Sequence, residues 1–250
     1  MGTMLRISVR QLASRSKLIL ILLLALLPVG LAALVSVVRE DSTSDHGFIN
    51  GILDGLLIAG ILPIVTMVLA TSSFGNELED RTLSYLVLKP VSRWLIVLPK
   101  LLASILIGGL VLIASGVAAT LLGGGSIGAV LVVLDGNLQA ALAVGVALLA
   151  GVVTYAAIFT WAGLMTSRAI AFALIYVFVW EGLISSFLEG VRYLSVRGYT
   201  LAIMHGIDET GLEALSFRVI EFPAAMVGAI VVTLAFYLLT VRRLRRMDVP

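Results

Sequence analysis

Acidic, basic and hydroxyl side chains gather in one stretch of the chain, residues 76–93. It reads Asn-Glu-Leu-Glu-Asp-Arg-Thr-Leu-Ser-Tyr-Leu-Val-Leu-Lys-Pro-Val-Ser-Arg. Asn76 is a good helix N-cap, and Glu79 three residues later completes a capping box. Acids in a first turn match the helix dipole, and the residue before a proline avoids helical geometry. We therefore predict a short amphipathic helix with a charged tip, which either contacts a partner or simply joins two larger elements.

The other reactive residue types are scarce. The chain has no cysteine, which excludes disulfides, thiolate nucleophiles and Cys-ligated metals. Its two histidines, His46 and His205, fall in segments that we expect outside the hydrocarbon, and there is no His-Glu-x-x-His motif. Residues 123–126 are glycine-rich but lack the following lysine of a phosphate-binding P-loop. We expect no catalytic residue, metal or cofactor on this chain, and a serine or metal-dependent intramembrane protease is not supported.

Glu181 is an acid within an apolar run. The 13 residues that separate it from Arg168 place it roughly 20 Å along a helix at about 1.5 Å per residue. A charge near the middle of a bilayer costs about 2.5–3.5 kcal/mol on insertion scales, so such residues usually face a bundle interior or a wet cavity. Glu181 is therefore a pathway candidate. The alternative is that the run ends early and Glu181 lies near the outer headgroups, paired with Arg192.

Composition indicates what must position these residues. Apolar residues make up 60% of the chain and charged residues 13%, against roughly 45–50% and about 25% in soluble domains. A bilayer can cover that much apolar surface, and its spanning elements are helices or closed barrels. The apolar runs are continuous rather than alternating, which indicates helices. We predict an all-α polytopic membrane helix bundle, with residues 1–250 forming a single transmembrane domain. The net charge of +2 is too small to indicate nucleic acid as a partner.

Hydropathy predicts six transmembrane helices, since about 20 apolar residues span a bilayer. They are residues 17–38, 51–73, 94–122, 138–165, 169–188 and 219–241. The first run is longer than that of a signal peptide, so we expect it to be retained. Residues 1–16 have apolar residues on one face and arginines elsewhere, which favours an interfacial helix over a disordered basic tail. Pro63 should kink the second span.

Orientation follows from lysine and arginine. Most of the 17 lie before the first span, between the second and third spans, and after the last span. The positive-inside rule then puts both termini and residues 74–93 in the cytoplasm. We expect a multi-pass protein of the plasma membrane.

The stretch Glu-x-Glu-Asp-Arg-Thr-Leu-x-Tyr-Leu, followed by Lys-Pro and Ser-Arg before a span, resembles the cytoplasmic segment of type-2 ABC transporter permeases. These are the membrane subunits of ABC exporters. The number, order and orientation of the predicted spans also resemble that family, as does the basic arm before the first span. The resemblance covers essentially the whole chain, and residues 77–93 are its specific part.

The resemblance implies that this segment is a coupling helix, which docks on a separate P-loop ATPase subunit that holds ATP and Mg. The implied contact residues are Glu77, Glu79, Asp80, Arg81, Thr82 and Tyr85. It also implies a homodimer or a heterodimer with a second permease, and short re-entrant or surface helices in residues 189–218. A non-catalytic membrane scaffold or assembly protein without an ATPase is the alternative. Few polar residues in the spans suit a lipid-like or amphipathic cargo, but peptides, drugs and ions stay open.

Overall fold

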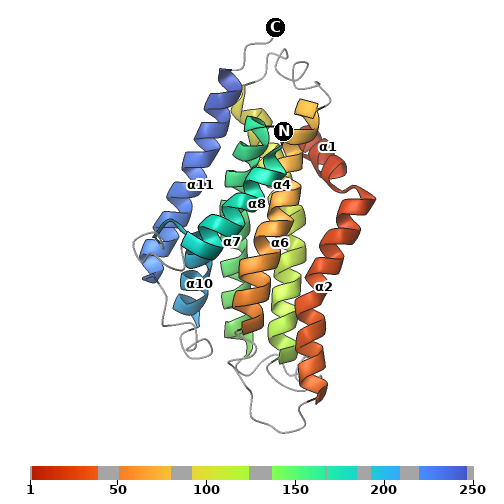
Figure 1. Ribbon diagram of the computed structural model, residues 1–250, viewed down its shortest axis with the longest axis vertical. Helices are drawn as coiled ribbons and strands as arrows, with labels where there is room; N and C mark the ends of the chain where they lie inside the picture. Colours follow the sequence, from red (N-terminus) through yellow and green to blue (C-terminus); the bar gives the residue numbers. More distant parts are fainter. Residues whose placement is uncertain are drawn as a thin grey trace.

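The computed structural model is a bundle of helices (Figure 1). It describes residues 2–38, 51–79, 92–123, 137–166, 168–184, 193–208 and 220–246. Every regular element within those ranges is helical, which confirms the all-α fold class there. Five helices are long and apolar enough to cross a membrane: Arg15–Val37, Ile52–Leu78, Trp94–Leu122, Leu138–Met165 and Phe222–Arg245. They correspond to five of the six predicted spans, and a count of six is not confirmed.

The first helix, α1 (Gly2–Leu12), lies against α6 (Trp94–Gly123). Three apolar residues recur at intervals of three or four and so share one face, which packs on the core; they are Leu5, Val9 and Leu12. Arg6 and Arg10 are exposed on other faces. The predicted amphipathic helix is therefore present. It ends at Leu12, a few residues earlier than predicted, and α2 (Arg15–Val38) follows.

The helix α7 (Asn137–Met165) is the centre of the bundle. The helices α4 (Leu62–Glu79), α6, α10 (Val196–Ile207) and α11 (Phe222–Arg245) all pack against it. Figure 1 shows α2 and α11 on opposite sides of this group, with α1 and the last turns of α11 at the same end of the molecule. That end is called the terminal end below.

The second predicted span changes helix type in its middle. A π-helical segment, η1 (Ile52–Ile61), leads directly into α4. Pro63 lacks an N–H and its ring crowds the carbonyl four residues earlier, in η1. A wider π turn relieves that crowding, and such turns are a known cause of helix distortion. The structure shows a change from π to α geometry next to Pro63, while the predicted kink stays a prediction.

The prediction that a separate helix begins at Asn76 is wrong. The helix α4 continues through Asn76 and ends at Glu79. Phe74 is fully buried in a cluster with residues of α6, α7 and α11. The hydroxyl of Ser73 bonds to the carbonyl of Ala70 within the helix, at 2.7 Å, so this polar side chain does not end it. Packing of Phe74 therefore overrides the local capping signal.

The fifth predicted span, 169–188, is shorter in the described residues. It consists of α8 (Ala169–Ile175) and a second π-helical segment, η3 (Tyr176–Ile184). Its apolar stretch, Ala169–Gly182, falls below the length of the five long helices. In Figure 1, α10 lies beyond α8, farther from the terminal end. Residues 185–188 lie outside the described part of the chain.

Candidate functional site

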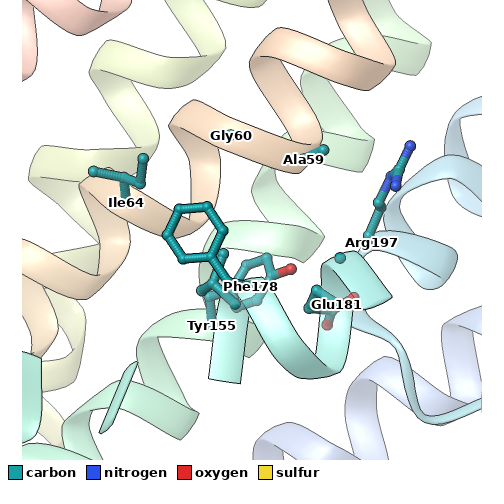
Figure 2. Close-up of a pocket in the computed structure, with 9 residues that line it drawn as sticks. Ala59, Gly60, Ile64, Tyr155, Phe178, Glu181 and Arg197 are labelled. Carbon is teal, nitrogen blue, oxygen red and sulfur yellow. The ribbon is translucent and has the colours of Figure 1, made fainter. Parts of the chain in front are cut away.

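A small cavity of about 120 Å³ lies where the two π-helical segments meet α4, α7 and α10 (Figure 2). Its wall is mostly apolar, with a polar part built from Tyr155, Glu181 and Arg197. The remaining labelled lining residues are Ala59, Gly60, Ile64 and Phe178. Irregular helical turns of this kind often occur at functional sites. The sequence predicts one of the three polar residues, Glu181, and misses the other two.

Glu181 is buried, with 4% of its surface exposed, and its carboxylate binds the start of α10. The hydroxyl of Ser195 donates to Oε2 at 2.5 Å, and the amide of Val196 donates to Oε1 at 2.9 Å. The hydroxyl of Tyr176 donates to Oε1 at 3.3 Å. An acid at a helix N-terminus satisfies free amides and matches the helix dipole. Glu181 is thus buried inside the bundle, and Arg192, its alternative partner, lies outside the described residues.

Ser195 serves two elements at once. Besides donating to Glu181, its hydroxyl oxygen accepts the amide of Gly198 at 3.0 Å, which makes it the N-cap of α10. This is the usual role of a serine at a helix start. The first turn of α10 is therefore fixed to η3 through Glu181, and the carboxylate position depends on the cap.

Arg197 in the same turn pairs with Asp54 of η1. Nε and Nη2 of Arg197 donate to Oδ1 of Asp54 at 2.9 and 2.8 Å. Both side chains are about one quarter exposed, so solvent weakens this pair. The first turn of α10 consequently contacts both π-helical segments.

Tyr155 of α7 has no accessible surface and stacks on Phe159, with ring centroids 5.6 Å apart. Among the described residues its hydroxyl makes no hydrogen bond of normal geometry, although the Glu181 carboxylate is near enough to interact with it. Figure 2 shows that hydroxyl on the cavity side, in the direction of Glu181 and Arg197. A buried hydroxyl normally has a partner. The cavity exceeds the roughly 10–15 Å³ that one water needs, so it can hold water or a polar group of a bound molecule.

A second polar cluster lies at the terminal end, around Lys100 of α6. Lys100 is 5% exposed, and its ammonium group donates to Oε1 of Glu77 at 2.5 Å and to the carbonyl of Ser73. It also lies 4.5 Å from the centre of the Phe74 ring. The sequence shows Lys100 only as one basic residue early in the third span. Its partner lies 23 residues earlier, a distance that no helical spacing rule covers.

Only some of the predicted coupling residues lie in the described part of the chain. Glu77 is 15% exposed and faces α6 through Lys100, and the backbone of Glu79 ends α4. Asp80, Arg81, Thr82 and Tyr85 lie outside the described residues. Within the described residues no group of His, Cys, Asp and Glu side chains could hold a metal ion.

A family model described as "ABC-2 family transporter protein" matches residues 13–180. The match begins before the first predicted span, includes all of residues 77–93, and ends one residue before Glu181. A search of curated proteins found no match to this chain.

Proposed function

This chain belongs to the ABC-2 family of transporter proteins, and we propose that it is the permease of an exporter driven by a separate ATPase. The family match carries this proposal, because it supports a role as a membrane subunit of an ABC transporter. The 250 residues contain no P-loop motif, which supports the proposal that a partner hydrolyses the nucleotide. Two ATPase subunits and two permeases, identical or different, would complete the transporter.

Residues 77–93 form the proposed contact with the ATPase in the cytoplasm. Charged and hydroxyl side chains suit a groove on a soluble protein, and the contact candidates are Glu77, Glu79, Asp80, Arg81, Thr82 and Tyr85. Two long helices, α4 and α6, flank the segment. A segment held between rigid helices can pass a rigid-body movement to the bundle. Both termini are proposed to share the cytoplasmic side, since exposed arginines of α1 and α11 lie at one end.

The cavity at Glu181 is the proposed part of the translocation path on this chain. It offers a hydroxyl donor from Tyr155 and the half-buried guanidinium of Arg197 within an apolar wall. An apolar wall with few polar groups suits part of an amphipathic molecule, since the volume of about 120 Å³ is below the roughly 300–1,000 Å³ of a pocket for a whole ligand. The cargo is accordingly proposed to be amphipathic, with a polar group that accepts hydrogen bonds.

Co-purification tests the ATPase partnership. The full chain, extracted in mild detergent from its own organism with a C-terminal tag, should retain a soluble P-loop ATPase in stoichiometric amount. Reversal of the three central charges (Glu79→Lys, Asp80→Lys, Arg81→Glu) should remove most of it. Arg245→Glu, at an exposed position, is the matched control and should retain it. Absence of any ATPase, or full retention after the triple reversal, would leave a scaffold without an energy source.

A further inference from the structure

We propose that Glu77 and Lys100 form a clamp that makes the two ends of the cytoplasmic segment move as one body. The inference rests on the proposed coupling to an ATPase and assigns a positioning role within the chain to both residues. Through its ion pair with Lys100, Glu77 then links movement of the ATPase-binding segment to α6, in addition to any direct contact of Glu77 with the ATPase. Lys100 itself is not among the residues proposed to contact the ATPase.

The position of the pair carries the inference. Glu77 lies two residues before the end of α4 at Glu79, and Lys100 lies six residues after the start of α6 at Trp94. The segment between those two helices is the one proposed to dock on the ATPase. An ion pair of 2.5 Å between Glu77 and Lys100 therefore bridges the segment at its base. Lys100 adds a bond to the Ser73 carbonyl and a contact with the Phe74 ring, so it contacts three residues along the end of α4.

The clamp rests on a buried apolar cluster that joins four helices. The cluster contains Phe74 from α4, Ile96 and Val97 from α6, Leu164 from α7, and Val241 and Leu244 from α11. The hydroxyl of Tyr237 in α11 also donates to the carbonyl of Trp94 in α6, at 3.3 Å. Dense packing transmits displacement instead of absorbing it. A push on either end of the segment therefore reaches α7 and α11 as well.

The helix α4 extends from the clamp to the cavity. Ile64 lines the cavity and Glu77 belongs to the clamp, and the offset of 13 positions between them corresponds to about 20 Å of helix. The two sites thus share one uninterrupted rigid element. Movement of the clamp would shift a cavity wall without any intermediate hinge in α4.

The choice of a charged pair is itself informative. Replacement of a buried ion pair by packed apolar residues is often neutral or stabilising, while removal of one partner leaves a buried charge without compensation. Stability alone would not need Lys100 and Glu77. Their geometry supplies a short, directional link between two helices, which an apolar contact does not.

Spin labels test the clamp without any ATPase. Because the native chain has no cysteine, Asn76→Cys and Ser92→Cys place one label at each end of the segment. Pulsed EPR on the full chain in lipid nanodiscs measures the distribution of the distance between labels. We expect a narrow distribution with the native pair, at least a twofold broadening with Glu77→Gln, and recovery in the charge-swapped variant Glu77→Lys with Lys100→Glu. Glu221→Gln, at the start of α11, is the control and should not broaden it.

A double variant distinguishes loss of the clamp from misfolding of the whole chain. Glu77→Met with Lys100→Met keeps side-chain volume and removes both charges, so it should remain monodisperse on size-exclusion chromatography yet give the broad distribution. A narrow distribution in the double variant or in Glu77→Gln would overturn the clamp. With the co-purified ATPase, Lys100→Gln, which changes no proposed ATPase contact, should still bind it but lose at least half of the ATP-driven transport of an amphipathic dye. If no ATPase co-purifies, the proposed function fails while the EPR result still decides the clamp.

Discussion

Arg197 and Asp54 are 143 residues apart in the sequence, and two nitrogens of the arginine donate to one carboxylate oxygen of the aspartate. The pair connects α10 with η1. Glu181, which binds the turn containing Ser195 and Val196, connects α10 with η3. A single helical turn thus holds both π-helical segments at the cavity wall. Movement of either segment would therefore have to break these contacts or carry α10 with it.

Loss of the Arg197–Asp54 pair should have a small effect on stability. Because both side chains are about one quarter exposed, Asp54→Asn should lower the free energy of unfolding by no more than about 1 kcal/mol. Thermal unfolding in detergent measures this, with Arg197→Lys as a variant that keeps the charge but loses the guanidinium geometry. A loss several times larger would mean that the pair is shielded from solvent in the membrane.

Loss of the Glu181 carboxylate should lower the free energy of unfolding more than loss of the Arg197–Asp54 pair. Glu181→Ala removes the acceptor for Ser195 and Val196 at the start of α10 and leaves two buried donors unpaired. Hydrogen bonds to charged groups contribute about 1.5–3 kcal/mol each, so the unfolding temperature should fall clearly. Glu181→Gln keeps a hydrogen-bond acceptor, so its unfolding temperature should fall less than that of Glu181→Ala. Equal effects of the two variants would contradict the capping role.

Tyr155→Phe should change the free energy of unfolding by no more than about 1 kcal/mol, because the hydroxyl makes no hydrogen bond of normal geometry. Stacking on Phe159 does not require the hydroxyl and should persist. Unfolding temperature measures the first expectation, and transport of amphipathic dyes measures whether the hydroxyl contributes to cargo recognition. A marked loss of stability would indicate that the hydroxyl binds ordered water.

Gly163→Ala should destabilise the bundle. A Cβ atom at Gly163 would lie 2.6 Å from the carbonyl oxygen of Thr71 and 3.0 Å from its Cα, so α4 and α7 would have to separate. Small residues permit such close approach of membrane helices, and forced separation costs about 1–3 kcal/mol. Gly109→Ala is the matched control, since its Cβ would find its nearest atom at 4.0 Å. Similar unfolding temperatures for the two variants would contradict this account.

Local signals of the sequence fail where packing competes with them. Asn76 and Glu79 satisfy a capping pattern, yet α4 passes through Asn76 and ends at Glu79, because burial of Phe74 stabilises the helix there. The length expected for the fifth span is likewise not confirmed, since the described helix ends at Ile184 with a π-helical segment. Hydropathy measures apolar length and cannot report helix type.

The sequence by itself determined the class of protein, the all-α fold and the positions of five long helices, because an apolar run of sufficient length has few alternatives in a bilayer. It also determined the family, through the stretch at residues 77–93 and the span order. Tertiary structure decided which polar groups meet. Lys100 finds Glu77, Arg197 finds Asp54, and Glu181 finds Ser195, because helix packing brings together residues whose separation in sequence follows no period.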